Sequence, residues 1–350
     1  MGKIINTAII GFGMSGEYFH AAFLDADPNY RLIKVVERHS NRSKHLYPYI
    51  EVVRDFSSVL DDDDIDLIII NTPNHLHFEM AKKALMFGKH VVVEKPFTTT
   101  SKEAEELINI AAAQGKILTV YQNRRWDGDF LTVKKIIESK ILGELVEFES
   151  HFDRFRNYIK PNSWKEEILP GAGLLYDIAS HLIDQSVCLF GNPTSLYTDL
   201  RTQRPSGKII DAFEVILNYN KLKVTLKSNY LSKIPLPRFT LHGTEGSYIK
   251  NGLDPQEETL KKYGYRKSPD WGAEPSEFWG MIDAKLNGLI FYGEIETIAG
   301  SYASFYENLY EVLVNGKELA VKPMEALNTI RIIELAMESS RTKSEVKLKE

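Results

Sequence analysis

Short apolar runs alternate with helical periods over the first 120 or so of the 350 residues, and this alternation constrains the fold more than any other feature. The apolar runs cover residues 7–10, 32–37, 65–71, 90–93 and 117–121, and amphipathic segments lie between them, notably at 78–87 and 102–114. Buried strands that alternate with helices are typical of a parallel sheet covered on both faces. Because crossovers between such strands are right-handed, we expect a doubly wound α/β domain over residues 1–123.

The pattern changes after about Arg124. Strand-like segments lie at residues 146–152, 212–219, 222–231, 238–242 and 247–250, and helices are expected at 131–139, 174–190 and 323–340. Alternating polar and apolar residues favour an open, mostly antiparallel sheet with one polar-leaning face. We therefore expect a C-terminal α+β domain over residues 124–350, whose sheet either meets water or packs on a second subunit.

Charge and cysteine content exclude several classes of protein. The net charge of −5 and the scattered basic residues argue against a nucleic-acid or anionic-membrane partner, which would favour a basic face. The single cysteine, Cys188, excludes an internal disulfide framework. No apolar run approaches the ~18 residues that span a bilayer, and nothing resembles a signal peptide, so we expect a cytoplasmic protein.

A glycine motif of the form G-x-G-x-x-G directly follows the first apolar run and leads into a helical stretch. It consists of Gly11, Phe12, Gly13, Met14, Ser15 and Gly16. In this context the glycines allow a tight turn, close approach of the backbone to a pyrophosphate, and close packing of helix on strand. Glu37 ends the second run about 20 residues later, where a carboxylate is expected to bind the adenosine ribose. The motif therefore predicts a Rossmann domain that binds NAD or NADP.

Glu37 also bears on the choice between the two cofactors. A carboxylate at this position repels the 2′-phosphate of NADP, so NAD is favoured. However, Arg38, Arg42 and Lys44 follow at once, and this basic cluster could hold a 2′-phosphate if Glu37 turned away.

Lys95 follows the apolar run at 90–93 and precedes Pro96. The carboxyl ends of strands in an open α/β sheet face the ligand crevice, so Lys95 is suited to stabilise a developing alkoxide. The alternative is a surface lysine paired with Glu94.

Asp177 and His181 are four residues apart on the helix expected at 174–190, so they are neighbours on its surface. A histidine there can take a hydroxyl proton as hydride leaves the same carbon, while the aspartate orients the ring or binds substrate. A purely structural hydrogen bond is the alternative. His75 and His77 suggest zinc, but no third ligand is evident, and we expect no metal.

Together these segments resemble the glucose–fructose oxidoreductase / inositol dehydrogenase / rhizopine-catabolism (Gfo/Idh/MocA) family along essentially the whole chain. The match is carried by residues 11–16, by Thr72-Pro73-Asn74 with His77, by the Glu94-Lys95-Pro96 sequence, and by Asp177 with His181. Residues 121–127 look most similar to the branch that contains NADP-dependent scyllo-inositol dehydrogenases. Gly171-Ala172-Gly173 and Ala179 depart from positions that are commonly glycine, and that branch lacks an acid at the position of Glu37.

The resemblance implies that Lys95 and His181 carry the chemistry and that Asp177 assists. It also implies a Lys95-Pro96 peptide that is often cis, and dimers or tetramers formed through the open sheet. Contacts to the cofactor beyond the glycine motif, Glu37 and Arg38 are expected from Thr72, Pro73, Asn74, His77, Glu94, Lys95, Gln122 and Asn123.

The expected reaction transfers hydride between the nicotinamide and a hydroxyl or ketone of a sugar or cyclitol. Contacts to this substrate are expected from Arg154, Asn157, Tyr158 and Trp164, besides Asp177 and His181, although each could equally be a sheet-edge or core residue. Two alternatives remain: a non-catalytic nucleotide-binding regulator on the same fold, and a glycosidase that uses the redox step transiently.

Overall fold

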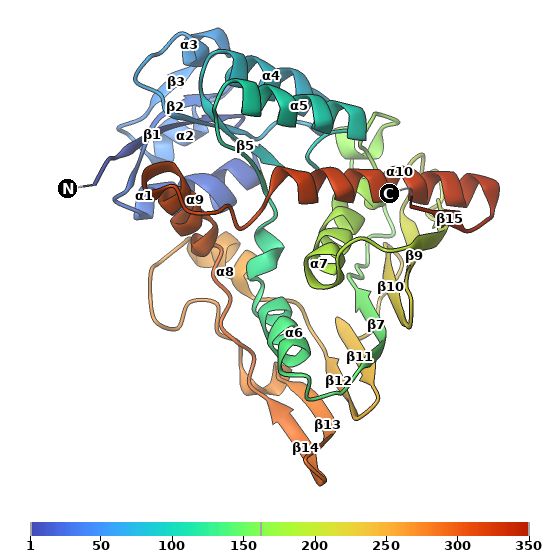
Figure 1. The fold of residues 1–350 in the computed structure, drawn as a ribbon. Coiled ribbons are helices and arrows are strands. Elements are labelled where there is room, and N and C mark those ends of the chain that lie inside the picture. Colours follow the sequence, from blue (N-terminus) through green and yellow to red (C-terminus); the bar gives the residue numbers. More distant parts are fainter. Residues whose placement is uncertain (1, 162, 349–350) are drawn as a thin grey trace. The chain divides into compact units, whose positions relative to one another are not determined.

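The computed structural model describes residues 2–161 and 163–348 and divides the chain into two compact units (Figure 1). Unit 1 runs to Asn123 and also contains Gln256–Trp271 and Ser301–Leu327. Unit 2 contains Arg124–Pro255, Gly272–Gly300 and the segment from Asn328 onward. The sequence predicted a single boundary after residue 123, whereas two later segments belong to the first unit.

Unit 1 contains a six-stranded sheet in the order β3-β2-β1-β4-β5-β6. Its strands are β1 (Ile5–Ile10), β2 (Tyr30–Val36), β3 (Glu51–Val53), β4 (Leu67–Ile70), β5 (His90–Glu94) and β6 (Leu118–Tyr121). Every neighbouring pair is parallel, and β1 and β4 lie side by side where the strand order reverses. This parallel strand order confirms the doubly wound Rossmann fold. Ligands of such sheets bind beyond the carboxyl ends of the strands, at the point where the order reverses.

Helices connect these strands. They are η1 (Gly16–Ala21), α1 (Ala22–Ala26), α2 (Arg42–Leu46), α3 (Ser57–Leu60), η2 (Asn74–Leu76), α4 (His77–Met86) and α5 (Ser101–Ala113). Figure 1 shows α4 and α5 side by side. The start of α5 is defined by a capping box, in which Thr100 accepts a hydrogen bond from the Glu103 amide while the Glu103 carboxylate accepts one from the Thr100 amide.

Aromatic packing explains why late segments return to unit 1. These segments form α8 (Gln256–Tyr263) and α9 (Ala303–Asn315). Tyr306 on α9 is 1% exposed, and its ring stacks on Phe23 of α1 with centroids 6.2 Å apart. Tyr302 meets Phe19 of η1 edge-on at 6.0 Å. Rings of this size dominate the burial of apolar area, so they draw α9 onto the first helix of the Rossmann fold.

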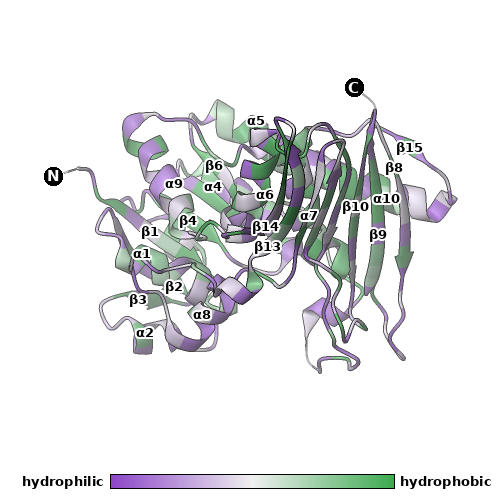
Figure 2. Ribbon diagram, turned by 90° about the horizontal axis from the view of Figure 1, so that it is seen from below, coloured by the Kyte–Doolittle hydropathy of each residue, from purple (hydrophilic) through white to green (hydrophobic). Residues whose placement is uncertain are grey.

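Unit 2 contains a nine-stranded sheet in the order β14-β13-β12-β11-β7-β10-β9-β8-β15. Its strands are β7 (Leu145–His151), β8 (Ser195–Arg201), β9 (Ala212–Tyr219), β10 (Leu222–Asn229), β11 (Phe239–Gly243), β12 (Gly246–Lys250), β13 (Gly280–Leu286), β14 (Leu289–Ile295) and β15 (Val346–Lys347). Among the described strands of this sheet, only β7 and β10 pair in parallel, so the expectation of a mostly antiparallel sheet is confirmed. Figure 2 shows its strands side by side, coloured by hydropathy.

The remaining helices are η3 (Asn123–Trp126), α6 (Gly128–Ser139), η4 (Trp164–Glu166), η5 (Leu175–Ala179), α7 (Ser180–Phe190), η6 (Ser276–Phe278) and α10 (Pro323–Thr342). The single helix expected at 174–190 is divided, because η5 is a wider π-helical turn that continues into α7. π-Helical turns are rare and are often found at functional sites. This turn carries Asp177. Among the described residues, no helix is both long and apolar enough to cross a membrane.

Candidate active site

Gly11 and Gly13 in the glycine loop after β1 differ in the space around them. Gly11 has φ +92°, and a Cβ atom there would lie 2.4 Å from the carbonyl oxygen of Asn71. At Gly13, by contrast, a Cβ atom would meet no atom within 4 Å. The first glycine is therefore required by the turn itself. The space over the second glycine is open, as expected where a backbone must let a pyrophosphate approach.

Asn71 closes the glycine loop onto β4, a role that sequence reasoning missed. Its side-chain amide donates a 2.9 Å hydrogen bond to the carbonyl of Gly11. The same amide nitrogen lies 2.6 Å from a Cβ built on Gly16, which explains why position 16 is glycine as well. The position of Asn71 directly after an apolar strand was the available signal.

Two buried polar atoms lie where a dinucleotide is expected to bind. The hydroxyl of Thr72 follows β4 and the amide oxygen of Gln122 follows β6, and neither has a hydrogen-bond partner among the described residues. Buried polar atoms are normally paired, so such atoms at the carboxyl edge of a Rossmann sheet suit a ligand. Together with the open space over Gly13, they fit a nicotinamide dinucleotide.

Glu37 lies at the end of β2, but its carboxylate is turned into its own loop. It accepts hydrogen bonds from the amides of Arg42 at 3.1 Å and Ser43 at 2.8 Å, and from the hydroxyls of Ser40 and Ser43. Burial raises the pKa of Glu37, but these hydrogen bonds outweigh burial and hold the pKa below its ordinary value. The carboxylate therefore serves as an acceptor at the start of α2, and both of its oxygens are occupied.

Lys95 follows β5, and its peptide bond to Pro96 is cis, as the resemblance implied. The preceding Glu94 is buried, with 7% of its surface exposed. Its carboxylate accepts hydrogen bonds from Ser15, His20 and the Lys95 amide.

His77 contacts the segments that follow β4 and β5, and these contacts occupy both of its ring nitrogens. The ring is fully buried, and its nitrogens lie 2.9 Å from the carbonyl oxygens of Pro96 and Thr72. Burial lowers the pKa of His77, so the neutral ring donates to one of these carbonyls at a time. His77 thus links the segments that follow β4 and β5 through contacts at both of its ring nitrogens.

Unit 2 brings Asp177 together with a lysine that sequence reasoning missed. The ammonium of Lys165 lies 3.0 Å from Oδ1 of Asp177, and this carboxylate raises the pKa of Lys165, so the lysine stays protonated. Tyr230 is 7% exposed, and burial together with the charge of Asp177 raises the pKa of its hydroxyl. His181 is 4% exposed and lies one turn further along the same helix. The site combines a buried histidine with an ionised carboxylate–ammonium pair.

The segment between β7 and η5 carries the expected substrate residues and is held by Arg204, which is 3% exposed. Its guanidinium donates to the carbonyl of Tyr158 at 2.7 Å and pairs with the carboxylates of Glu166 at 2.8 Å and Asp211 at 3.0 Å. Such charge-assisted bonds are among the stronger ones in proteins. Arg204 lies about 30 residues beyond the end of this segment, and no local pattern pointed to it.

The side chains that this segment presents are a mixture of cations and aromatic rings. Arg154 stacks over Phe152 at 5.0 Å, and the ammonium of Lys165 lies 5.8 Å from the ring of Trp164. Asn157 and Tyr158 are exposed. Exposed aromatic and hydrogen-bonding groups of this kind are suited to bind a polyhydroxylated molecule.

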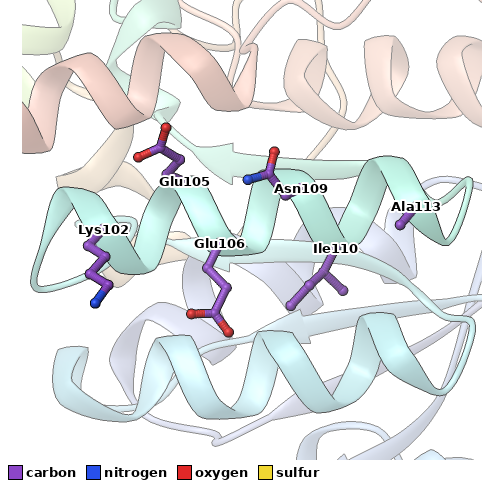
Figure 3. A pocket seen from close by; sticks show the side chains of 6 residues that line it. All are labelled: Lys102, Glu105, Glu106, Asn109, Ile110 and Ala113. Atoms are coloured by element: carbon purple, nitrogen blue, oxygen red, sulfur yellow. The ribbon is translucent and has the colours of Figure 1, made fainter.

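A surface hollow lies on α5 of unit 1. Figure 3 shows its lining side chains projecting from the one helix, and they are Lys102, Glu105, Glu106, Asn109, Ile110 and Ala113. Glu106 is already paired with Lys82 at 2.6 Å, and none of the predicted site residues borders the hollow. We therefore assign it no role. Within residues 2–161 and 163–348, no group of three or more acidic, histidine or cysteine side chains is arranged to hold a metal ion.

Two family models cover most of the chain. The model described as the NAD-binding Rossmann fold of an oxidoreductase family matches residues 5–122. The model described as the C-terminal alpha/beta domain of the same family matches residues 134–348. The chain therefore belongs to the Gfo/Idh/MocA oxidoreductase family, with a Rossmann domain that binds a nicotinamide cofactor.

Individual relatives match over nearly their full length. The oxidoreductase YdgJ of Escherichia coli is 39% identical, over 97% of this chain and 98% of that protein. The scyllo-inositol 2-dehydrogenase (NADP(+)) IolW of Bacillus subtilis is 36% identical, over 98% of this chain and 96% of that protein. Among solved structures, the oxidoreductase yvaA of Bacillus subtilis has a TM-score of 0.96 at 36% identity, over 100% of this chain and 99% of that one.

Proposed function

We propose that the protein is an NAD(P)-dependent dehydrogenase that oxidises a CH–OH group of a cyclitol or sugar and catalyses the reverse reduction. The observation that carries the proposal is the buried His181, four residues after Asp177 of the Asp177–Lys165 pair, on a chain that also has a lysine after β5 and open space over Gly13. A non-catalytic regulator has no need of these groups. The scyllo-inositol 2-dehydrogenase among the relatives supports the choice of substrate class.

In this proposal the bound nicotinamide supplies the hydride acceptor, and the residues of the chain handle the proton and the charge. His181 takes the proton of the reacting hydroxyl, because an imidazole can accept and return a proton near neutral pH. Lys95 stabilises the negative charge that develops on the oxygen. Asp177, held by Lys165, accepts hydrogen bonds from a neighbouring hydroxyl. Arg154, Trp164, Asn157 and Tyr158 contact the rest of the ring.

A substrate panel tests this proposal. Inositols, aldoses and sugar lactones are incubated with NAD, NADP and their reduced forms, and the absorbance of the reduced nicotinamide is followed. We expect steady turnover with at least one cyclitol or sugar. Cleavage of a glycoside without net change in the nicotinamide would identify the redox-assisted glycosidase instead. Cofactor binding without any turnover would support the regulator.

The geometry at Glu37 leads us to propose NADP as the preferred cofactor, which was the alternative in the sequence analysis. The expectation of NAD required a carboxylate that faces the ribose, whereas Glu37 is bound to its own loop. Arg54 stiffens the same loop by donating to the Glu37 carbonyl at 2.7 Å and to the Asn41 side chain at 2.6 Å. The loop thus presents the exposed Arg38 and Arg42 on a fixed backbone, as a phosphate group requires.

Replacing Arg38 by Ala is expected to raise the dissociation constant of NADPH by about tenfold, because a charge-assisted hydrogen bond is lost. The dissociation constant of NADH is expected to stay within about twofold, since NADH has no 2′-phosphate. Equilibrium titration of the nicotinamide fluorescence measures both. Tighter binding of NADH than of NADPH by the unmodified protein would contradict the choice of NADP.

We also propose that the protein is a homodimer or homotetramer assembled through the large sheet. The edge strand β14 exposes 75% of Leu289, 81% of Ile290 and 72% of Tyr292. An edge strand with unpaired backbone groups and exposed apolar side chains is a ready surface for a second chain.

Replacing Ile290 by Lys is expected to shift the protein to a lower oligomeric state, because a charge would be buried in the interface. Light scattering after size-exclusion chromatography measures the mass. Ile234, which is 88% exposed in a loop of the same unit, provides the matched control, and its replacement by Lys is expected to leave the mass unchanged. An unchanged mass for the Ile290 variant would rule out β14 as the contact.

A further inference from the structure

A buried hydrogen-bond network lies behind Lys95 in unit 1 and is not explained by the proposed chemistry. At its centre is the carboxylate of Glu94. Oε1 accepts hydrogen bonds from the hydroxyl of Ser15 and from Nε2 of His20 at 3.0 Å, and Oε2 accepts one from the Lys95 amide at 3.0 Å. His20 is 0% exposed, and no part of the sequence pattern had pointed to it.

The network continues from His20 into the aromatic cluster of unit 1. A carboxylate can only accept hydrogen bonds, so Nε2 of His20 donates to Glu94. Nδ1 of the same ring lies 2.6 Å from the Tyr306 hydroxyl, with which it shares a hydrogen bond. The ring of Tyr121 covers His20, with centroids 4.5 Å apart, and Tyr30 donates to the Tyr306 carbonyl at 2.7 Å. The histidine thus has a single orientation, fixed by contacts at both nitrogens and on its face.

A buried carboxylate needs such donors. Removing Glu94 from water costs free energy that only hydrogen bonds can offset. Burial by itself raises the pKa of Glu94, but the bond from His20 and the other donors outweigh it and lower the pKa below its ordinary value. The carboxylate therefore stays ionised and holds all three of its donors.

The three donors belong to different parts of the site. Ser15 is in the glycine loop that is expected to bind the pyrophosphate, Lys95 is the proposed catalytic lysine, and His20 is in the π-helical turn η1. We propose that Glu94 and His20 are positioning residues, which tie the glycine loop to the backbone of Lys95 through one carboxylate. Glu94 is then no direct contact of the cofactor. Cofactor affinity and the placement of the Lys95 ammonium depend on it together.

The test uses the full chain and two measurements on the variants Ser15→Ala, His20→Phe and Glu94→Gln. The first is the dissociation constant of NADPH, which we expect to rise about tenfold in each, as for the loss of a hydrogen bond to a charged group. Ser15 and His20 both donate to Oε1 of Glu94. The dissociation constant of the double variant is therefore expected not to exceed the larger of the two single-variant constants. Effects that multiply in the double variant would overturn the proposal.

The second measurement is kcat with and without the Lys95→Met substitution. His20→Phe is expected to lower kcat about tenfold in the unmodified chain and to have no further effect when Lys95 is already absent. The kcat measurement rests on the proposed function, whereas the measurement of NADPH binding does not. Absence of any turnover with normal NADPH binding would refute the dehydrogenase, and the dissociation constants would still decide the role of Glu94.

His90 provides the matched control at the opposite end of β5. It is a partly buried histidine whose Nδ1 accepts from the Ile117 amide at 3.0 Å, and it lies away from the glycine loop. The His90→Phe variant is expected to lose thermal stability but to keep its NADPH affinity and kcat. If His20→Phe and Glu94→Gln likewise bind NADPH within about twofold of the unmodified protein, the network is structural only and the proposal fails.

Discussion

Replacing Lys95 by Met, or His181 by Asn, is expected to lower kcat by roughly a thousandfold while the protein stays folded. The methionine keeps the aliphatic part of Lys95 but removes the positive charge that stabilises the developing alkoxide. Asparagine keeps a hydrogen-bonding group at the buried position 181 but cannot take up a proton. Steady-state kinetics on the best substrate of the panel measure both effects.

NADPH binding and a comparison variant, Lys165→Met, distinguish a loss of chemistry from a loss of binding. NADPH binding is expected to stay within a few fold, because we propose that Lys95 and His181 act on the substrate. The Lys165→Met variant serves as a comparison. The Lys165 ammonium lies 3.0 Å from the Asp177 carboxylate, and its loss is expected mainly to raise KM. Near-normal turnover by the Lys95 and His181 variants would mean that other groups carry the proton and the charge.

Replacing Gly13 by Val is expected to weaken NADPH binding by roughly a hundredfold, about 2.7 kcal/mol, without a loss of stability. The new side chain meets no protein atom within 4 Å at its Cβ, so the folded chain accommodates it. Its methyl groups instead occupy the space through which the pyrophosphate approaches the backbone. Fluorescence titration and thermal unfolding give the two quantities.

Gly11→Ala is the matched counterpart. There the Cβ atom would lie 2.4 Å from the Asn71 carbonyl at a φ of +92°, so we expect a loss of stability of roughly 2 kcal/mol or more. The two variants separate a glycine that the turn requires from one that a ligand requires. Tight NADPH binding by a well-folded Gly13→Val variant would show that the cofactor does not cross this loop.

The Rossmann fold could be predicted from sequence because its signals are local. The glycines directly follow the apolar run that forms β1, and Lys95 directly follows the strand β5. The division of the chain was less predictable. Tyr302 and Tyr306 join unit 1 through contacts with Phe19 and Phe23, which lie almost 300 residues earlier. Such long-range packing leaves no periodic pattern in the sequence.

Among the candidate site residues, those with a local sequence signal could be predicted and those without one were missed. Asp177 and His181 were predicted together because they are four residues apart in a stretch expected to form one helix, which the structure divides into η5 and α7. Lys165 and Arg204 were missed, since a scattered lysine or arginine is ordinarily a surface charge. Glu37 was correctly placed at the end of its strand, but its orientation depends on donors from Ser40 and from Arg42 and Ser43, the first residues of α2. Sequence position alone does not determine where such a side chain points.

The central claim is that this chain transfers hydride between a carbinol carbon and a nicotinamide. Its most direct test is a single turnover with a substrate from the panel that carries deuterium on the reacting carbon. Mass spectrometry of the recovered cofactor is expected to show one deuterium in the reduced nicotinamide, and the Lys95→Met protein is expected to transfer it far more slowly. Bound cofactor that gains no deuterium from any sugar or cyclitol would contradict the claim.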